Sequence, residues 1–309
     1  MSGKPSANYI YKFKISILAS ISYITIGCTT MPLHEAGTLS SYDNIGPAEG
    51  KLFKQRVYVD GDGLSRMKTV SIIPTTYTID AASHITLEAD RSLVSNALDR
   101  ALCIALSERY QMVPNGQPVD LTIRSVITDI TPTDKAMAGL ATVISTGSSF
   151  IIPGDIPFLS VPRLPIGLGG LSVEAEAIDH TAAQRAAIVW ARGANSFQNK
   201  PRYSEVGDAY TLSTKFAGDF SQILITGKKA AAIDLSLPSK VQMQSWLGGK
   251  PKYPACEYFG RAPGLPGMIA GRLGLPPQWT DESPYIPIAE NSDQENLANA
   301  RSTKVLVTQ

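Results

Sequence analysis

Residues 172–179 (SVEAEAID) and residues 186–192 (AAIVWAR) decide the fold, because together they predict a β-hairpin that turns over residues 180–184. Successive side chains of a strand point to opposite faces of the sheet. Alanines leave room for a closely packed helix, so the hairpin predicts a sheet with helices on its apolar face. The first strand has one apolar and one acidic face: Val173, Ala175 and Ala177 against Glu174 and Glu176.

Segments before and after the hairpin predict two amphipathic helices and further strands. In residues 86–111 the apolar side chains recur at spacings of seven, four and three, and residues 208–225 carry an equally tight apolar stripe. Residues 121–130 (LTIRSVITDI) are rich in β-branched residues and predict a strand, with shorter strands at 56–59 and 70–73. We therefore expect an α+β fold with a mixed β-sheet of about four to five strands and both amphipathic helices packed on one face.

The first 27 residues predict a signal for export. Three lysines, with no acidic residue nearby, precede an uncharged run over residues 15–26. As a helix, this run is too short to span the hydrocarbon core of a bilayer, which is about 30 Å thick. A basic start followed by a short apolar run is the layout of a secretory signal peptide, predicted here over residues 1–27.

Residues 24–28 (ITIGC) resemble the lipobox of bacterial lipoproteins, with Thr25 departing from its usual aliphatic residue. The resemblance implies cleavage between Gly27 and Cys28, and acylation of Cys28 by two or three chains that would anchor the protein to a membrane. Thr29 stands where an aspartate retains lipoproteins at the inner membrane, which favours the outer membrane, facing the periplasm. The alternatives are the inner membrane, the cell surface, and an ordinary signal peptide with an incidental cysteine.

The remaining chain divides into three predicted parts. Residues 28–50 are rich in small and turn-forming residues and predict a tether after the lipidated cysteine. Residues 51–227 contain the α+β domain, interrupted by an apolar insertion with glycines and prolines at 136–170. Residues 228–309 predict an irregular extension and a polar tail, because residues 248–287 contain eight prolines and seven glycines.

The composition argues against several classes of function. The 28 basic and 27 acidic residues give a net charge of +1, and removal of the three lysines of the signal peptide leaves −2. Such a balanced chain gives no reason to expect a nucleic-acid partner. Only three histidines and three cysteines are present, so we expect no metal, no cofactor and no enzymatic activity.

One dense polar cluster offers an alternative. Glu174, Glu176, Asp179 and His180 could bind a cation or a small ligand, or serve a hydrolase, because two carboxylates two residues apart share a strand face. The other interpretation is a solvated sheet face, on which arginines from across the hairpin pair with the acidic side chains.

Cys103 and Cys256 are a candidate disulfide. Cys103 lies opposite the apolar stripe of the first helix, beside Asn96, Arg100 and Ser107, while Cys256 lies in the extension. In an oxidising compartment a disulfide would staple the extension to the outer face of that helix. Two separate, unpaired thiols are the alternative.

Three segments carry a resemblance to a known family. Residues 36–42 (AGTLSSY) contain glycine, leucine and tyrosine shortly after the lipid cysteine. Residues 113–116 (VPNG) form a proline–glycine turn that leads into the strand LTIRSVITDI. Glu174, Glu176 and Asp179 form a Glu-x-Glu-x-x-Asp hairpin motif.

In their order and spacing, these segments resemble a bacterial lipoprotein family catalogued as domain of unknown function 3313. The resemblance covers residues 36–226, and it departs from the family at residues 181–183, Thr-Ala-Ala, where the family has Thr-Gly. It implies a lipoprotein domain without an established activity, and therefore no catalytic residue.

We expect a membrane-anchored envelope lipoprotein that acts as a binding or scaffolding module for an envelope transport or assembly system. The insertion at 136–170 and residues 265–279 are the expected contact surfaces for a protein partner, because both are more apolar than a small domain needs. The alternative is that these two segments cover each other and the sheet. A small-ligand or metal-binding protein that uses the acidic cluster is the alternative.

Overall fold

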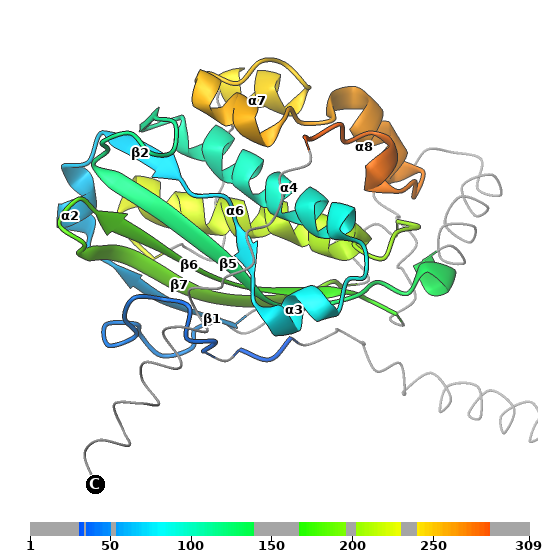
Figure 1. The fold of residues 1–309 in the computed structure, drawn as a ribbon, viewed down its shortest axis with the longest axis horizontal. Coiled ribbons are helices and arrows are strands. Elements are labelled where there is room, and N and C mark those ends of the chain that lie inside the picture. The colour runs from blue at the N-terminus through cyan, green and yellow to red at the C-terminus, as the bar shows by residue number, and fades with distance from the viewer. Residues whose placement is uncertain are drawn as a thin grey trace, which may run out of the picture.

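A seven-stranded mixed sheet is the framework of the described part of the chain (Figure 1). The computed structural model describes residues 31–33, 35–50, 54–138, 167–195, 202–229 and 240–284. The predicted signal peptide, Cys28, most of the insertion at 136–170 and the polar tail lie outside the described residues.

The sheet has the strand order β1-β7-β6-β5-β2-β4, and β3 pairs with β5. Strands β1, β7, β6 and β5 are antiparallel neighbours, whereas β2, β3 and β4 join by parallel pairing. The α+β class is confirmed, but the strand count exceeds the predicted four to five because β3 and β4 have two residues each, too few for an alternating pattern. The strands are β1 (Lys54–Val59), β2 (Thr69–Ile72), β3 (Thr76–Tyr77), β4 (Gln111–Met112), β5 (Leu121–Thr131), β6 (Gly170–Asp179) and β7 (Gln184–Gly193).

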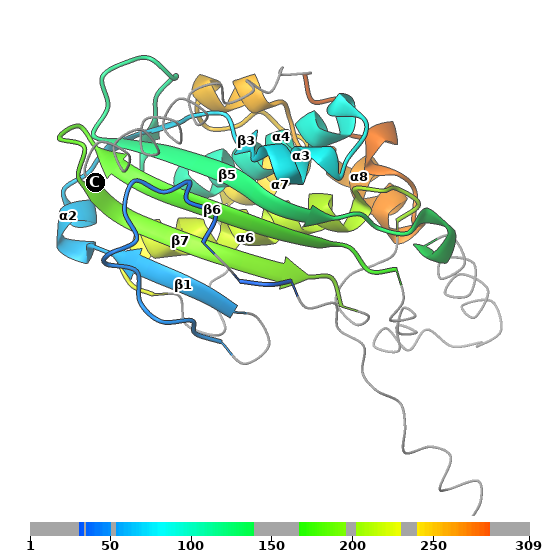
Figure 2. The same ribbon diagram turned by 60° about the horizontal axis from the view of Figure 1, so that its bottom comes forward.

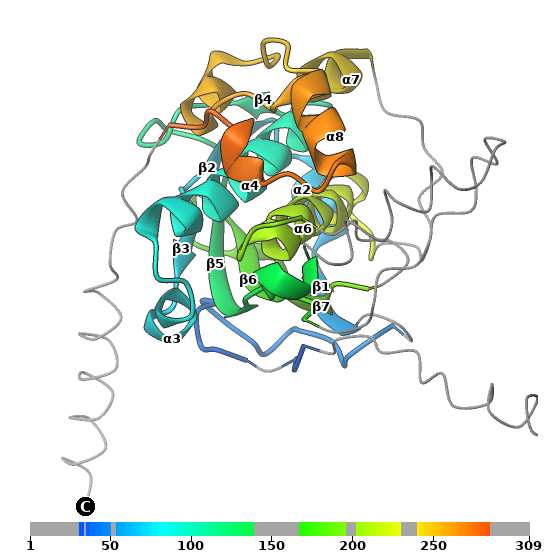
Figure 3. The same cartoon turned by 90° about the vertical axis from the view of Figure 1, so that its right-hand side faces the viewer.

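The two long helices, α4 (Glu88–Leu106) and α6 (Gly207–Thr226), lie side by side on one face of the sheet, as predicted (Figures 1 and 3). Helix α4 is shorter than the predicted 86–111, because Gln111 already belongs to β4. Two single-turn helices lie in the connections: α2 (Gly61–Ser65) joins β1 to β2, and α3 (Ile79–Ser83) joins β3 to α4.

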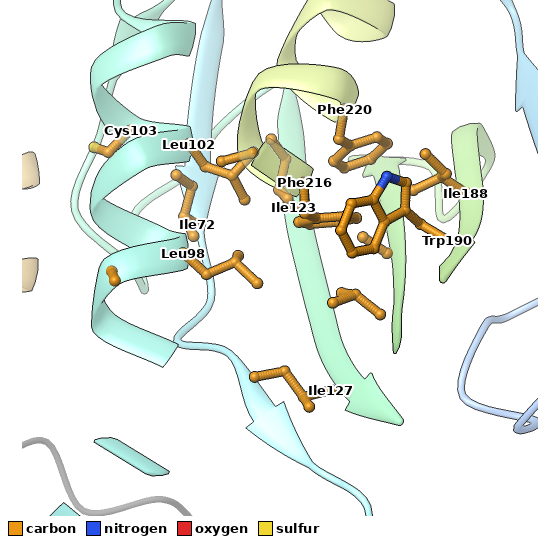
Figure 4. Close-up of a cluster of buried hydrophobic side chains, with 14 of the residues drawn as sticks. Ile72, Leu98, Leu102, Cys103, Ile123, Ile127, Ile188, Trp190, Phe216 and Phe220 are labelled. Atoms are coloured by element: carbon orange, nitrogen blue, oxygen red, sulfur yellow. The ribbon is translucent and has the colours of Figure 1, made fainter. Parts of the chain in front are cut away.

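The main core fills the space between these helices and the sheet (Figure 4). Trp190 of β7 meets Phe216 of α6 edge to face, with ring centroids 5.5 Å apart, and Phe220 stacks on Phe216. The alanines of β6 are fully buried beneath α6, as the hairpin pattern predicts. Burial of each large apolar side chain contributes about 1.5–3 kcal/mol, so this layer dominates the stability of the domain.

The C-terminal extension covers the outer face of α4 (Figure 1). It is less irregular than predicted, because four short helices form between its prolines and glycines. As a result, the polar side chains of α4 that lie opposite its apolar stripe are buried rather than solvated, with Asn96 and Arg100 at most 4% exposed. The short helices are α7 (Lys240–Trp246), η1 (Pro254–Phe259), α8 (Gly264–Arg272) and η2 (Pro277–Trp279).

Residues 35–50, here called the strap, lie across the opposite face of the sheet (Figures 2 and 3). Leu39 and Ile45 of the strap are buried against Ala187 and Val189 of β7. Within the tether predicted over residues 28–50, the strap is therefore docked on the sheet, because apolar side chains among its small residues pack there. No helix in the described ranges has the length and apolar character needed to cross a membrane.

Candidate functional site

Glu174 fixes the strap to the sheet. This side chain is 1% exposed, and its two carboxylate oxygens accept four hydrogen bonds from the strap. The backbone N–H groups of Ala36 and Thr38 donate at 2.8 and 3.1 Å, and the hydroxyls of Thr38 and Tyr42 each donate at 2.5 Å. Burial and the bond to this carboxylate raise the pKa of Tyr42, so its hydroxyl remains a donor.

Glu176, two residues further along β6, is a second anchor for the strap. Its Oε2 accepts bonds from the backbone N–H and hydroxyl of Ser40, at 2.9 and 2.6 Å, and from the amide of Gln184. Arg124 of β5 forms an ion pair with Oε1. Burial alone would raise the pKa of Glu176, but the bonds from Ser40, Gln184 and Arg124 outweigh it and hold the pKa below its ordinary value.

Asp179 belongs to a different cluster, at the hairpin turn. Its oxygens accept bonds from the backbone and hydroxyl of Thr181 and from the backbone of Ala183, which fixes the turn. Arg185 bridges Asp179 and Asp60, at 2.6 Å to each. The effect of burial on Asp179 is outweighed by the bonds from Thr181 and Arg185, so its pKa is lowered.

The predicted ligand site of Glu174, Glu176, Asp179 and His180 therefore does not form as one site. The two glutamates face the strap, Asp179 faces the hairpin cluster with Arg185, and His180 is exposed in the turn. The other interpretation is correct in one part, because Arg185 pairs with Asp179 across the hairpin, but the face is not solvated, since the strap covers Glu174 and Glu176. Protein donors occupy the carboxylate oxygens, and the described residues contain no group of three or more histidine, cysteine or acidic side chains arranged to hold a metal ion.

Cys103 and Cys256 are joined by a disulfide, with Cα atoms 5.6 Å apart, so the bond staples η1 to the outer face of α4. Both residues are 1% exposed. A second link lies one turn earlier in α4, where Arg100 forms an ion pair with Asp281 and Tyr210 of α6 donates a bond to the same carboxylate at 2.6 Å. Burial alone would raise the pKa of Asp281, so its lowered pKa reflects the strength of the pairing with Arg100.

An apolar cavity of about 430 Å³ opens between the stapled extension and the edge of the sheet. Ile72 and Pro74 at the end of β2 form one wall, and Met112 and Val113 of the β4 segment form another. The third wall comes from the extension, where Tyr258 and Phe259 of η1 meet edge to face, and Cys103 also lines the cavity. This size falls within the range of small-ligand pockets, which is about 300–1,000 Å³.

A buried carboxylate lies next to this cavity. Asp99 is fully buried in α4, one turn before Cys103, and accepts bonds from the backbone N–H and hydroxyl of Thr75 at 2.8 and 2.5 Å. Burial raises the pKa of Asp99 to about 7, although the bonds from Thr75 oppose the shift. Thr75 directly follows Pro74 of the cavity wall, so Asp99 fixes the loop that borders the cavity.

The sequence analysis did not identify the strap contacts, the cavity or the bond between Asp99 and Thr75. Residues 36–42 (AGTLSSY) are mostly small or polar, and this composition is equally typical of a linker. The cavity walls come from four separate segments, so no local pattern could have indicated it.

The family described as "Protein of unknown function (DUF3313)" matches residues 34–220. Two solved structures of a PelC dodecamer from Paraburkholderia phytofirmans resemble the chain, at 12% and 10% identity and TM-scores of 0.34 and 0.33. Each match covers 58% of this chain, and 99% and 98% of the PelC chains. A DUF4136 family protein from Bacteroides thetaiotaomicron resembles it at 12% identity and a TM-score of 0.28, over 58% of this chain and 100% of that chain. No curated protein matches the chain.

Proposed function

The chain belongs to the DUF3313 family of proteins of unknown function, and on that premise we propose that it is a membrane-anchored, non-enzymatic lipoprotein of the bacterial envelope that binds a partner. Acyl chains on Cys28 anchor it to the outer membrane, with the folded body in the periplasm. The body is a binding module that presents its apolar cavity to a partner of an envelope transport or assembly system.

The observation that carries this proposal is the construction of the cavity. One wall belongs to an extension that a disulfide and the pair of Arg100 and Asp281 hold in place, so the opening is preformed. Preformed, mostly apolar cavities bind with little loss of conformational entropy. The aromatic rings of Tyr258 and Phe259 in its wall are of the residue types enriched at protein interfaces.

The position of the cavity also favours a partner in the periplasm. The cavity borders the first residues of β5, since the backbone N–H of Ile73 donates to Ile123. The described chain begins near Thr131, at the other end of that strand, where Met31 lies. The eight residue steps from Ile123 to Thr131 span about 26 Å at about 3.3 Å per residue. The cavity is thus far from the proposed lipid anchor.

The acidic cluster supports binding of the strap rather than catalysis. A general acid or base needs an oxygen within reach of a substrate. The oxygens of Glu174 and Glu176 already accept bonds from Thr38, Ser40 and other strap donors. We therefore assign these carboxylates a structural role in the proposed module.

Photocrosslinking in cells tests the proposal. A photoreactive amino acid replaces Asn115, which is exposed and lines the cavity, and the matched control replaces Asp43, which is exposed on the strap. We expect Asn115 to give a discrete crosslinked species of higher mass, absent from the control. Equal crosslinking at both positions, or none at Asn115, contradicts the proposal. Native mass spectrometry of the purified protein separates a protein partner from a small apolar ligand, which would be retained as a constant added mass.

A further inference from the structure

We propose that one end of the molecule, centred on α8, rests directly on the lipid surface to which the protein is anchored. This inference rests on the lipid anchor of the proposed function and adds the orientation of the body on the bilayer. The end in question is the one at which β5 and β7 finish and β6 begins (Figure 3).

The start of the described chain lies at this end. Met31 contacts the last residue of β5 and the first residue of β6: the hydroxyl of Thr131 lies 3.2 Å from the sulfur of Met31, and a side chain at Gly170 would collide with that sulfur. Only two residues separate Met31 from Cys28, so the three steps between their Cα atoms span at most about 11 Å of extended chain. An acylated Cys28 therefore holds this end of the sheet close to the bilayer.

Helix α8 presents its large apolar side chains outward at the same end. Its inward face carries only small residues, among them Gly267, Ala270 and Gly271, and a side chain at Gly271 would collide with the guanidinium of Arg202. Apart from Arg272 in the last turn, its outward face is apolar at the helical spacings of three and four residues, which is the pattern of an interfacial helix rather than of a water-facing one. The outward residues are Leu265, Met268, Ile269 and Leu273, all between 50 and 57% exposed.

Hydrogen bonds place further exposed apolar side chains beside α8. The backbone N–H of Tyr203 donates to Gly274 at the end of α8, and Tyr203 is 55% exposed. Gln278 donates to Asp90 in the first turn of α4, and the neighbouring Trp279 is 69% exposed. Tyrosine and tryptophan are the residues that membrane proteins concentrate at the interface between lipid and water.

The start of α6 connects α8 to the end of the sheet at which Met31 lies. Asp208 accepts a bond from the backbone N–H of Gly169 at 2.8 Å and another from the hydroxyl of Thr133. Arg202 and Tyr203, which contact the end of α8, lie a few residues before the start of α6 at Gly207. Met31, the first turn of α6 and α8 are therefore parts of one end surface.

The face covered by the strap is a poorer candidate for lipid contact. Leu39 and Ile45 of the strap point into the sheet and are buried. The exposed strap positions include Asp43, Asn44 and Glu49, and no large apolar side chain of the strap is exposed. Contact through the end surface buries exposed apolar area, whereas contact through the strap face would desolvate charges.

Quenching of tryptophan fluorescence by brominated lipid tests the inference. The acylated full-length protein, matured from its own signal peptide, is reconstituted into vesicles of phosphatidylethanolamine and phosphatidylglycerol with brominated acyl chains. We expect substantial quenching, and we expect Trp279→Phe to remove at least half of it. Trp246→Phe is the matched control: Trp246 is 45% exposed in α7 and precedes Leu247, whose carbonyl lies against Gly264 at the start of α8. Tyr203 bonds to Gly274 beyond the other end of this helix, whose nine residues are about 12 Å long.

Flotation of the same vesicles separates the two proposals. Protein that floats with the vesicles but shows no quenching, or shows equal quenching in wild type and Trp279→Phe, overturns the orientation and leaves the anchor intact. In that case the outward face of α8 is a docking surface for a protein. Protein that does not float overturns the anchor, and the orientation with it. Crosslinking at Asn115 reports independently on the cavity.

Discussion

Removal of the negative charge of Glu174 should release the strap while the rest of the domain stays folded. In Glu174→Gln, one oxygen remains to accept the bond from Ala36. The new amide group faces the three donors that share the other oxygen: the N–H and hydroxyl of Thr38 and the hydroxyl of Tyr42. The hydroxyls can rotate to accept, but the backbone N–H of Thr38 cannot.

The expected magnitude follows from these contacts. A hydrogen bond to a charged group contributes about 1.5–3 kcal/mol, and a buried donor left without a partner costs about 1–3 kcal/mol. We therefore expect the docking of the strap to weaken by about 3 kcal/mol, which corresponds to opening roughly a hundred times more often. The main core between α4, α6 and the sheet makes no contact with these atoms and should keep its stability.

Hydrogen–deuterium exchange with mass spectrometry measures this opening. A peptide from the strap, compared with one from α6, should exchange about a hundredfold faster in Glu174→Gln than in wild type. Asp43→Asn is the matched control, because Asp43 is exposed in the same strap and bonds only to Ser41. Unchanged protection of the strap in Glu174→Gln, or equal loss in the control, would refute the assignment of Glu174 as the anchor.

Replacement of both Cys103 and Cys256 by serine should lower the free energy of unfolding by about 2–5 kcal/mol, since the disulfide closes a loop of 153 residues. Urea denaturation measures this loss, and an unchanged midpoint contradicts the prediction. Burial raises the pKa of Asp99 from 3.8 to about 7, so its ionisation lowers the stability of the folded protein as the pH rises from about 4 to about 7. Asp99→Asn should therefore flatten this part of the profile of melting temperature against pH. A profile that runs parallel to that of the wild type speaks against this role of Asp99. The pKa of Glu176 is lowered from 4.5, so its contribution to stability is complete above about pH 4.5 and is lost as the pH falls through the lower pKa of the folded state. Hydrogen exchange of the Ser40 amide, corrected for the intrinsic rate, should therefore accelerate on acidification. Constant protection down to pH 2 argues against Glu176 as an anchor of the strap.

The sequence determined the elements whose pattern repeats along the chain. The apolar stripe of residues 208–225 became α6 almost residue for residue, and the alternation of alanine and glutamate in residues 172–179 placed the helices and the acidic side chains on opposite faces. Such periodicity is a local property, because it depends on 3.6 residues per helical turn and two per strand. The family resemblance rests on the same local motifs, and the match over residues 34–220 confirms it.

Only the tertiary structure decided what covers each face. In the sequence, Glu174 and Glu176 form an acidic stripe suited to water or a cation, and Arg100 lies on the polar side of a helix. In the structure all three are buried, because the strap and the extension, distant in sequence, supply their hydrogen-bond partners. Burial of a charge is favourable only when such partners are in place. Partners more than a hundred residues away leave no periodic signal in the sequence, so the structure alone reveals them.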